Sequence, residues 1–162
     1  MQKTTLDVGA GEYRERLGPS LWILVSAAVA GPMATAVFAP IDTTAALVIG
    51  AVVGVAIVAL LVAGSPVVAI TNGELRAGRA HIDVTLLGDP IAVTGEEART
   101  ARGAGLDPRS WHVIRGGIDA VIVVPVIDPD DPTPVWVVST RTPDRLVAAM
   151  RRAQVRRRTP RR

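Results

Sequence analysis

The sequence predicts an α+β membrane protein, with an N-terminal transmembrane helix hairpin followed by a small antiparallel β domain that a C-terminal helix closes. Two uncharged apolar stretches, residues 20–39 and 44–64, predict the hairpin. From residue 65 onward, short β-branched runs separated by turn residues predict the β domain. A final segment with helical spacing of its apolar residues, starting after Thr142, predicts the closing helix.

Both apolar stretches have the length of a membrane span. At 1.5 Å per residue each covers about 30 Å, the thickness of the bilayer hydrocarbon core. Backbone polar groups in lipid must be satisfied within the segment, so both stretches are predicted to be helices. The connection "PIDT" (40–43) is short enough to require an antiparallel hairpin. A cleaved signal peptide is the rival interpretation, and the second span so soon after the first argues against it.

The basic residues near the spans predict the orientation. They are Lys3, Arg14 and Arg16 before the first span, and Arg76 and Arg79 after the second. The connecting loop has none, so by the positive-inside bias both ends are cytoplasmic and Asp42 lies outside. We therefore expect a multi-pass protein of the cell inner (plasma) membrane, with its N-terminus and its C-terminal domain in the cytoplasm.

Small residues occur at helical spacing in both spans. Gly50 and Gly54 form a GxxxG pattern, and Ala27, Gly31 and Thr35 form a ridge on the first helix. Such ridges allow helices to approach closely. We favour packing of the two spans against each other over a seam between two copies of the chain.

The chain divides into four parts by composition and charge. These are a cytoplasmic N-terminal segment (1–19), the transmembrane hairpin (20–64), a cytoplasmic β-rich domain (65–150) and an Arg-rich tail (151–162). Residues 1–150 hold 11 basic against 15 acidic residues, whereas the last twelve carry seven arginines and no acid. Cysteine is absent, which excludes disulfides and thiolate metal sites.

Turn residues delimit the expected strands. The run "PVVAIT" (66–71) is closed by Asn72-Gly73, a strong hairpin signal. Thr94-Gly95-Glu96-Glu97 is a capping-box pattern that opens a short helix ending at Gly103. Further strands are expected at 81–87, 91–93, 110–116, 118–127 and 135–141. Pro125 places the strand at 118–127 on a sheet edge or at a bulge.

The closing helix has a cap and a buried face. Thr142 is its predicted N-cap and Pro143 its first residue. Leu146, Val147, Met150 and Gln154 share one face, which we expect to pack on the sheet.

Three carboxylates, Asp128, Asp130 and Asp131, lie in the acidic loop "DPDDPTP" (128–134). Position five of a calcium loop would be Pro132, and no glycine stands at position six, so the EF-hand pattern fails. Strand patterns flank the loop at a hairpin's distance, and Asp and Pro are turn formers. We favour a turn, with a cation-dependent or enzymatic role of the three carboxylates as the alternative.

No catalytic motif appears elsewhere. The sequence lacks a P-loop, GxGxxG, HExxH and GxSxG, and His81 and His112 lack metal-ligand spacing. We therefore expect no catalytic residue, no metal, no cofactor and no enzyme. In the last strand, Arg141, Trp136 and Ser139 are the candidate partner or anion contacts, although Trp136 also fits a core position and Arg141 a structural ion pair to the closing helix.

Three segments together resemble a known family. They are "YRERLGPSLW" (13–22), "SPVVAITNGELRAGRAHI" (65–82) and "DPDDPTPVWVVSTRTPDRLVAAM" (128–150), and "DPTP-x-W-x-VSTR-x-P" is the most specific part. Over residues 12–150 the chain resembles an uncharacterised actinobacterial membrane-protein family, a domain of unknown function. The chain departs at Val135, where an aromatic is expected, and at Gly116-Gly117. The layout also looks like a pleckstrin-homology-like split barrel; the resemblances imply a membrane location and no known activity.

The sequence favours a non-enzymatic binding or scaffold module on the cytoplasmic face of the membrane. Besides the lipid bilayer, its expected partners are anionic lipid head groups and an unidentified membrane or cytoplasmic protein. The candidate lipid contacts are Arg151, Arg152, Arg156, Arg157, Arg158, Arg161 and Arg162. A tail that only fixes topology is equally compatible. Nucleic-acid or ribosome contact is a less favoured alternative, because no aromatic residue is interleaved with the arginines.

Overall fold

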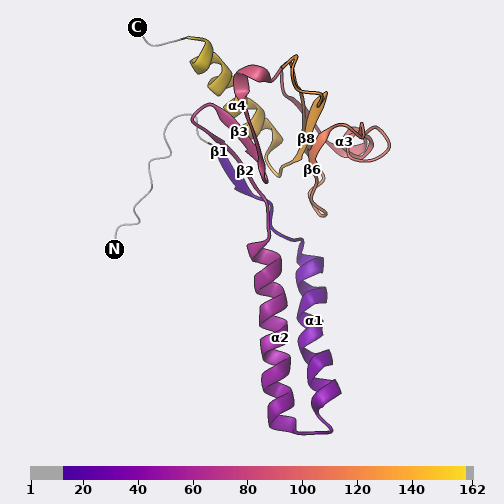
Figure 1. Ribbon diagram of the computed structural model, residues 1–162. Helices are drawn as coiled ribbons and strands as arrows, with labels where there is room; N and C mark the ends of the chain where they lie inside the picture. Colours follow the sequence, from indigo (N-terminus) through magenta and orange to yellow (C-terminus); the bar gives the residue numbers. More distant parts are fainter. Residues whose placement is uncertain (1–12, 160–162) are drawn as a thin grey trace. The chain divides into compact units, whose positions relative to one another are not determined.

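The computed structural model describes residues 13–159 and has an α+β fold (Figure 1). Its helices are α1 (Leu21–Phe38), α2 (Thr43–Ala63), α3 (Gly95–Ala101) and α4 (Pro143–Arg158), with a 3₁₀ turn η1 (Val84–Leu86). Its strands are β1 (Tyr13–Arg16), β2 (Val67–Thr71), β3 (Glu74–Ala77), β4 (Ala80–Asp83), β5 (Ile91–Val93), β6 (Trp111–Val113), β7 (Val121–Pro125) and β8 (Val135–Ser139). The chain forms two compact units: a helical unit, Gly18–Ser65, and a domain made of residues 13–17 and 66–159.

The helical unit is an antiparallel pair of apolar helices (Figure 1). Ser20 caps α1 by accepting from the Ile23 N–H, and Asp42 caps α2 by accepting from the Ala45 N–H at 2.7 Å. Both helices are long and apolar enough to cross a membrane, with mean hydropathies of 1.9 and 3.0. Only 6% of the apolar stretch in α1 and 11% of that in α2 are buried, so both helices are largely exposed.

Glycines hold α1 and α2 close together. A Cβ on Gly31 would lie 2.9 Å from the Gly50 carbonyl oxygen, and one on Gly50 would collide with Thr35 Oγ1. A Cβ on Gly54 would lie 3.5 Å from the Gly31 Cα, which is an ordinary van der Waals contact. The small residues therefore pack the two helices against each other, as predicted, and the backbones approach because side chains are absent.

The first sheet of the domain is antiparallel with the order β1-β2-β3-β4. Asn72 (φ +52°) and Gly73 (φ +79°) form the predicted tight turn between β2 and β3, which requires positive φ at both positions. β1 was not predicted, because its four residues carry no apolar alternation. It pairs with β2 from Tyr13↔Ile70 to Arg16↔Val67, so it belongs to the domain that follows the hairpin.

The strands expected at 81–87, 110–116, 118–127 and 135–141 are all shorter than predicted, and the first of them shows why. β4 ends at Asp83, whose Oδ1 accepts from the Thr85 N–H at 2.9 Å and from Thr85 Oγ1 at 2.7 Å. This local side-chain bonding competes with the strand ladder and turns residues 84–86 into η1.

The second sheet has the order β5-β7-β8-β6, and β6 runs parallel to β8. The expectation of wholly antiparallel pairing is therefore wrong at this edge. The sheet-edge position predicted from Pro125 is also wrong, because β7 lies between β5 and β8. The alternative, a bulge, fits: between the pairs Ile91↔Val123 and Leu87↔Val126, residues 88–90 lie opposite residues 124–125. Pro125 is tolerated as the last residue of β7, beyond Val123, the last residue of that strand paired with β5.

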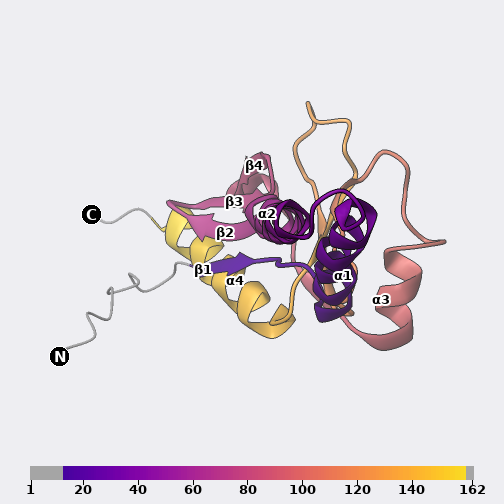
Figure 2. The ribbon, with the colours of Figure 1, turned by 90° about the horizontal axis from the view of Figure 1, so that it is seen from below.

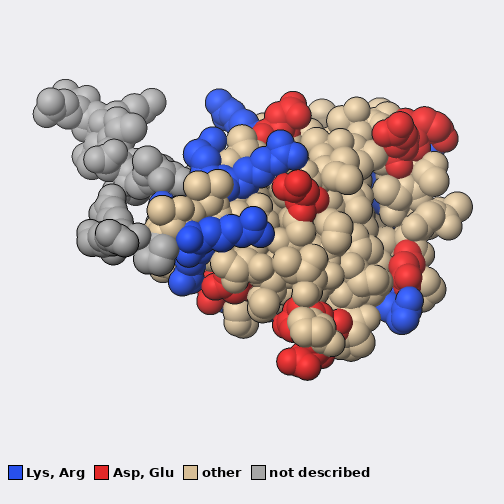
Figure 3. Space-filling view, turned by 90° about the horizontal axis from the view of Figure 1, so that it is seen from above, with Lys and Arg blue, Asp and Glu red and all other residues tan. Residues whose placement is uncertain are grey.

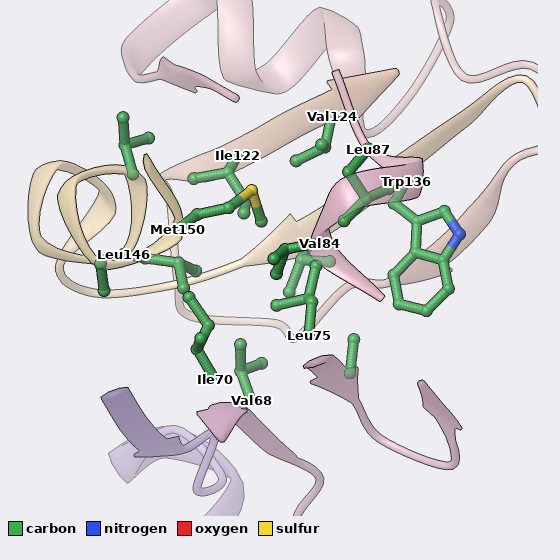
Figure 4. Close-up of a cluster of buried hydrophobic side chains, with 14 of the residues drawn as sticks. Val68, Ile70, Leu75, Val84, Leu87, Ile122, Val124, Trp136, Leu146 and Met150 are labelled. Atoms are coloured by element: carbon green, nitrogen blue, oxygen red, sulfur yellow. The ribbon is translucent and has the colours of Figure 1, made fainter. Parts of the chain in front are cut away.

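The core lies between both sheets and α4, which Figure 2 shows running alongside β1 and β2. Leu146 and Met150 of α4 reach Ile70 of the first sheet and Ile122 of the second (Figure 4). All four side chains are fully buried, and each such burial contributes about 1.5–3 kcal/mol. The predicted buried face of α4 is confirmed.

The prediction of a separate Arg-rich tail from residue 151 is wrong for residues 151–158, because α4 continues to Arg158. Ala153 and Gln154 within it are buried. Gln154 Nε2 lies 3.2, 2.9 and 3.1 Å from the carbonyl oxygens of Val84, Leu87 and Gly88. An amide has two N–H groups for these three acceptors, so Gln154 ties the end of the helix to η1.

We expect Gln154→Leu to lower the free energy of unfolding of the domain by about 1–3 kcal/mol, because it leaves buried carbonyls without donors. Urea denaturation of the full chain in neutral detergent measures this loss. Val155→Ala, at an exposed neighbouring position, is the control and should leave the midpoint unchanged. An equal effect of both substitutions would contradict the assigned role of Gln154.

We expect Gly50→Ala to separate α1 from α2, because its methyl group has no space beside Thr35. Gly54→Ala should be tolerated, because its methyl group meets only ordinary contacts. The chain has no cysteine, so spin labels can be placed at the exposed Met33 and Val52 after substitution by Cys. Pulsed electron paramagnetic resonance should show a longer, broader distance distribution for Gly50→Ala alone.

Candidate functional site

The most connected polar cluster joins β1 to the start of α4. We call Tyr13, Glu15, Thr140, Arg141 and Thr142 the Glu15 clasp. Glu15 Oε2 accepts from the Tyr13 hydroxyl and from the Thr140 hydroxyl, each at 2.6 Å. Glu15 Oε1 accepts from the Arg141 N–H at 3.0 Å. Both carboxylate oxygens are therefore used within the domain.

The hydroxyl groups of the clasp form a consistent donor order. The Tyr13 and Thr140 hydroxyls both donate to Glu15. Because the Tyr13 hydroxyl proton is used in this way, the Thr142 hydroxyl donates to the Tyr13 oxygen, 2.9 Å away. The predicted N-cap, Thr142, accordingly makes no side-chain cap bond to α4. Burial raises the pKa of Tyr13, and the hydrogen bond to the Glu15 carboxylate raises it further, because both disfavour the phenolate.

Arg141 is held by β1. Its Nη1 lies 3.6 Å from Glu15 Oε1 and donates to the Arg16 carbonyl at 3.3 Å, while the side chain stays 48% exposed. Arg141 thus makes a structural ion pair, but its partner is Glu15 of β1 and not the closing helix that the sequence suggested.

Trp136 and Ser139 do not form a surface for a partner, because both are buried. The Trp136 ring packs at 6.1 Å from that of Trp111, and Ser139 Oγ accepts from the Arg115 N–H at 3.1 Å. The core position considered for Trp136 is the one it occupies, because β8 is an inner strand whose side chains are buried on both faces.

A groove of about 790 Å³ runs between β1 and α4, beside the clasp. Its lining residues are Tyr13, Arg14, Glu15, Arg141, Thr142, Arg145, Ala148, Ala149 and Arg152. The sequence analysis used Arg14 only as an orientation signal and did not single out Arg145. The spacing of Arg145 and Arg152, seven residues apart on α4, was a visible signal, but the position of Arg14 depends on the unpredicted strand β1.

The arginines at the end of α4 differ in their surroundings. Arg157 Nη2 donates to the Asn72 carbonyl at 2.8 Å and lies 3.3 Å from Asp83 Oδ2. The Thr85 N–H and hydroxyl hold the pKa of Asp83 below its usual value, and Arg157 adds to this effect. Arg151 lies 3.9 Å from Asp89, and the side chains of Arg152, Arg156 and Arg158 are exposed. Arg161 and Arg162 lie outside the described residues.

The acidic loop forms a turn. Asp128 Oδ1 accepts from the Asp130 N–H at 3.1 Å, and Asp131 Oδ1 accepts from the Thr133 N–H at 2.8 Å. The latter bond lowers the pKa of Asp131. β7 and β8 pair as an antiparallel hairpin around this loop, as predicted. Within residues 13–159, no three His, Asp or Glu side chains are grouped so as to hold a metal ion.

The geometry defines an α+β domain whose first two strands are separated in sequence by an apolar helical hairpin. The chain belongs to the family described as Protein of unknown function (DUF3093), which matches residues 12–150. This match confirms the uncharacterised family that the sequence resembles. No curated protein and no solved structure matches the chain significantly.

The raised pKa of Tyr13 can be measured directly, because the chain has one tyrosine. Alkaline titration at 295 nm should give a midpoint above 10 in the folded protein and about 10 in concentrated urea. Folding favours the protonated phenol, so this stabilisation is complete below pH 10 and is lost as the pH rises toward the folded pKa.

Glu15→Gln provides the matched variant for this titration. It removes the charge that opposes phenolate formation, so the folded midpoint should move toward the value in urea. A folded wild-type midpoint at or below the urea value would contradict the burial of the Tyr13 hydroxyl in the clasp.

Proposed function

We propose that the protein is a membrane-anchored, non-enzymatic binding or scaffold module. α1 and α2 form the membrane anchor, and the α+β domain lies on the cytoplasmic face of the cell membrane. In this arrangement the domain binds a protein or an anionic lipid. Its two sheets and closing C-terminal helix are compatible with a pleckstrin-homology-like fold, although that likeness alone carries no function.

The observation that carries the anchor is the pairing of the strands on either side of the hairpin. β1 leads into α1, and α2 leads into β2. The Leu17 N–H donates to the Pro66 carbonyl at 2.9 Å, directly where the hairpin begins and ends. Both ends of the hairpin are thus held at one place in a folded sheet. A membrane hairpin has this property, because its two ends emerge on the same side of the bilayer.

Side-chain chemistry supports the bilayer as the surroundings of the helical unit. Leu21, Val29, Leu47 and Val55 are examples of large apolar side chains that are at least half exposed on α1 and α2. In water such a continuous apolar surface is costly, at roughly 25 cal/mol for each Å². Lipid removes this cost, and Ser20 and Asp42 each satisfy one of the backbone N–H groups that have no partner within their helix.

The basic surface on α4 supports an anionic partner. Figure 3 shows basic side chains gathered over one side of the domain, with acidic side chains beside them. Arg152, Arg156 and Arg158 of α4 are exposed. Each arginine near an anionic membrane contributes about 1 kcal/mol to attraction. Arg157 is engaged with Asn72 and Asp83 and is a weaker candidate.

The non-enzymatic part of the proposal rests on how the polar groups are used. The carboxylates of Asp128 and Asp131 hold the turn between β7 and β8, and Ser139 accepts a backbone hydrogen bond. Asp128, Asp131 and Ser139 thus have structural roles, and no catalytic role is needed to explain their presence.

Cysteine labelling tests the anchor and its orientation. Single cysteines replace the exposed Ile41, between α1 and α2, and Asp130, in the β7–β8 loop. In intact bacterial spheroplasts, a membrane-impermeant maleimide should label Ile41→Cys, whereas Asp130→Cys should react only after lysis. The cysteine-free parent chain is the control.

The opposite labelling pattern would contradict the proposed orientation and place the α+β domain outside the cytoplasm. Recovery of the protein in the soluble fraction, or its release by alkaline carbonate, would overturn the membrane anchor itself.

A further inference from the structure

We propose that the groove between β1 and α4 is a binding site for a phosphate group. The inference deepens the proposed function by naming a ligand class and a site for the anionic partner. The site differs from the arginine-rich end of α4, because its cations come from two elements and surround a concave space.

The charge of the groove is strongly one-sided. Four of its lining residues are arginines, Arg14, Arg141, Arg145 and Arg152, and the one carboxylate among them is Glu15. Glu15 is turned into the domain, with 14% of its side chain exposed and both oxygens hydrogen-bonded. It therefore compensates Arg141 and leaves three positive charges facing the same space.

These three arginines are available to a ligand. No hydrogen bond or ion pair joins the side chains of Arg14, Arg145 or Arg152 to another of residues 13–159. All three residues are exposed. By contrast, Arg102, Arg141 and Arg157 make hydrogen bonds or ion pairs within the domain. Holding three like charges around one groove is unfavourable without an anion, and an anion relieves the repulsion.

The shape of the groove suits a compact, multiply charged anion. Arg145 and Arg152 are seven residues apart on one face of α4, with the small Ala148 and Ala149 between them. Arg14 faces them from β1. Guanidinium groups form bidentate hydrogen bonds with phosphate oxygens, and three of them match the oxygens of a phosphate monoester. A carboxylate has fewer acceptors to share among three arginines.

The phosphate can belong to a soluble molecule or to a lipid head group, and both present the same oxygens. Arg14 precedes the first residue of α1 by only seven positions, which favours the lipid if α1 enters a bilayer. The experiment therefore needs one arm for each source.

The test uses the full chain in neutral detergent micelles at low ionic strength. Unfolding midpoints are followed while inorganic phosphate is titrated, and separately while phosphatidic acid is added to the micelles. We expect a saturable rise in the midpoint. A response to inorganic phosphate assigns a soluble ligand, and a response to phosphatidic acid alone assigns a lipid head group.

Two double variants with equal charge separate the groove from general attraction. Arg145→Gln with Arg152→Gln should weaken the apparent affinity at least roughly tenfold. Arg151→Gln with Arg158→Gln, on the same helix but outside the groove lining, should change it by no more than about twofold. All four positions are exposed, so both variants should fold, which circular dichroism verifies.

Equal weakening in the two double variants would overturn the site, and so would a wild-type protein that shows no saturable response to either probe. The micelle assay does not depend on where the chain resides in a cell. Failure of the groove is therefore distinguishable from failure of the membrane anchor, which the cysteine labelling tests.

Discussion

The structure of the domain depends on the pairing of β1 with β2 across the whole helix hairpin. Bringing together strands so far apart in sequence costs loop-closure entropy, which increases with the logarithm of the loop length. β1 has four residues and offers little apolar area to offset that cost. The Glu15 clasp supplies the missing stabilisation through charge-assisted hydrogen bonds from Thr140 and the Arg141 backbone. Thr140 and Arg141, which directly follow β8, therefore fasten the strand that precedes the helix hairpin.

α4 starts directly after the Glu15 clasp, and its two faces have different roles. Its buried face, with Leu146, Met150 and Gln154, closes the core between the sheets. Its exposed face carries arginines, whose positive charge is favourable near a helix C-terminus. The basic composition of the last residues is therefore a property of a packed helix up to Arg158, and Arg157 even contributes to the domain by bonding the β2–β3 turn.

The sequence predicted the elements whose signals are local. The apolar spans, the Asn72-Gly73 turn, the buried face of α4 and the hairpin around the acidic loop all follow from neighbouring residues. β1 was missed because "YRER" becomes a strand only beside β2, which no local pattern reveals. The parallel pairing of β6 with β8 was missed for the same reason.

The candidate site was the least predictable part, because it is built from residues distant in sequence. Arg141 was singled out for its position at the end of a strand, and the structure gives it a partner in Glu15. Trp136 and Ser139 were candidate contacts, but both are buried within β8 of the second sheet, and Trp136 has the core position that the sequence also allowed. Arg14 attracted attention only as an orientation signal, although it lines the groove with Arg145 and Arg152.

β1 thus connects the helix hairpin, the clasp and the groove within a few residues. Tyr13 and Glu15 hold the strand against the start of α4, Arg14 lines the groove, and Leu17 pairs with Pro66 where the hairpin begins. A side chain that bound an anion on a surface loop could move without consequence for the fold. Arg14 cannot shift far along β1 without changing the register of the whole strand with β2, because a slip of one residue inverts every side chain. The position of Arg14 in the groove is therefore fixed by the same hydrogen bonds that hold the domain together.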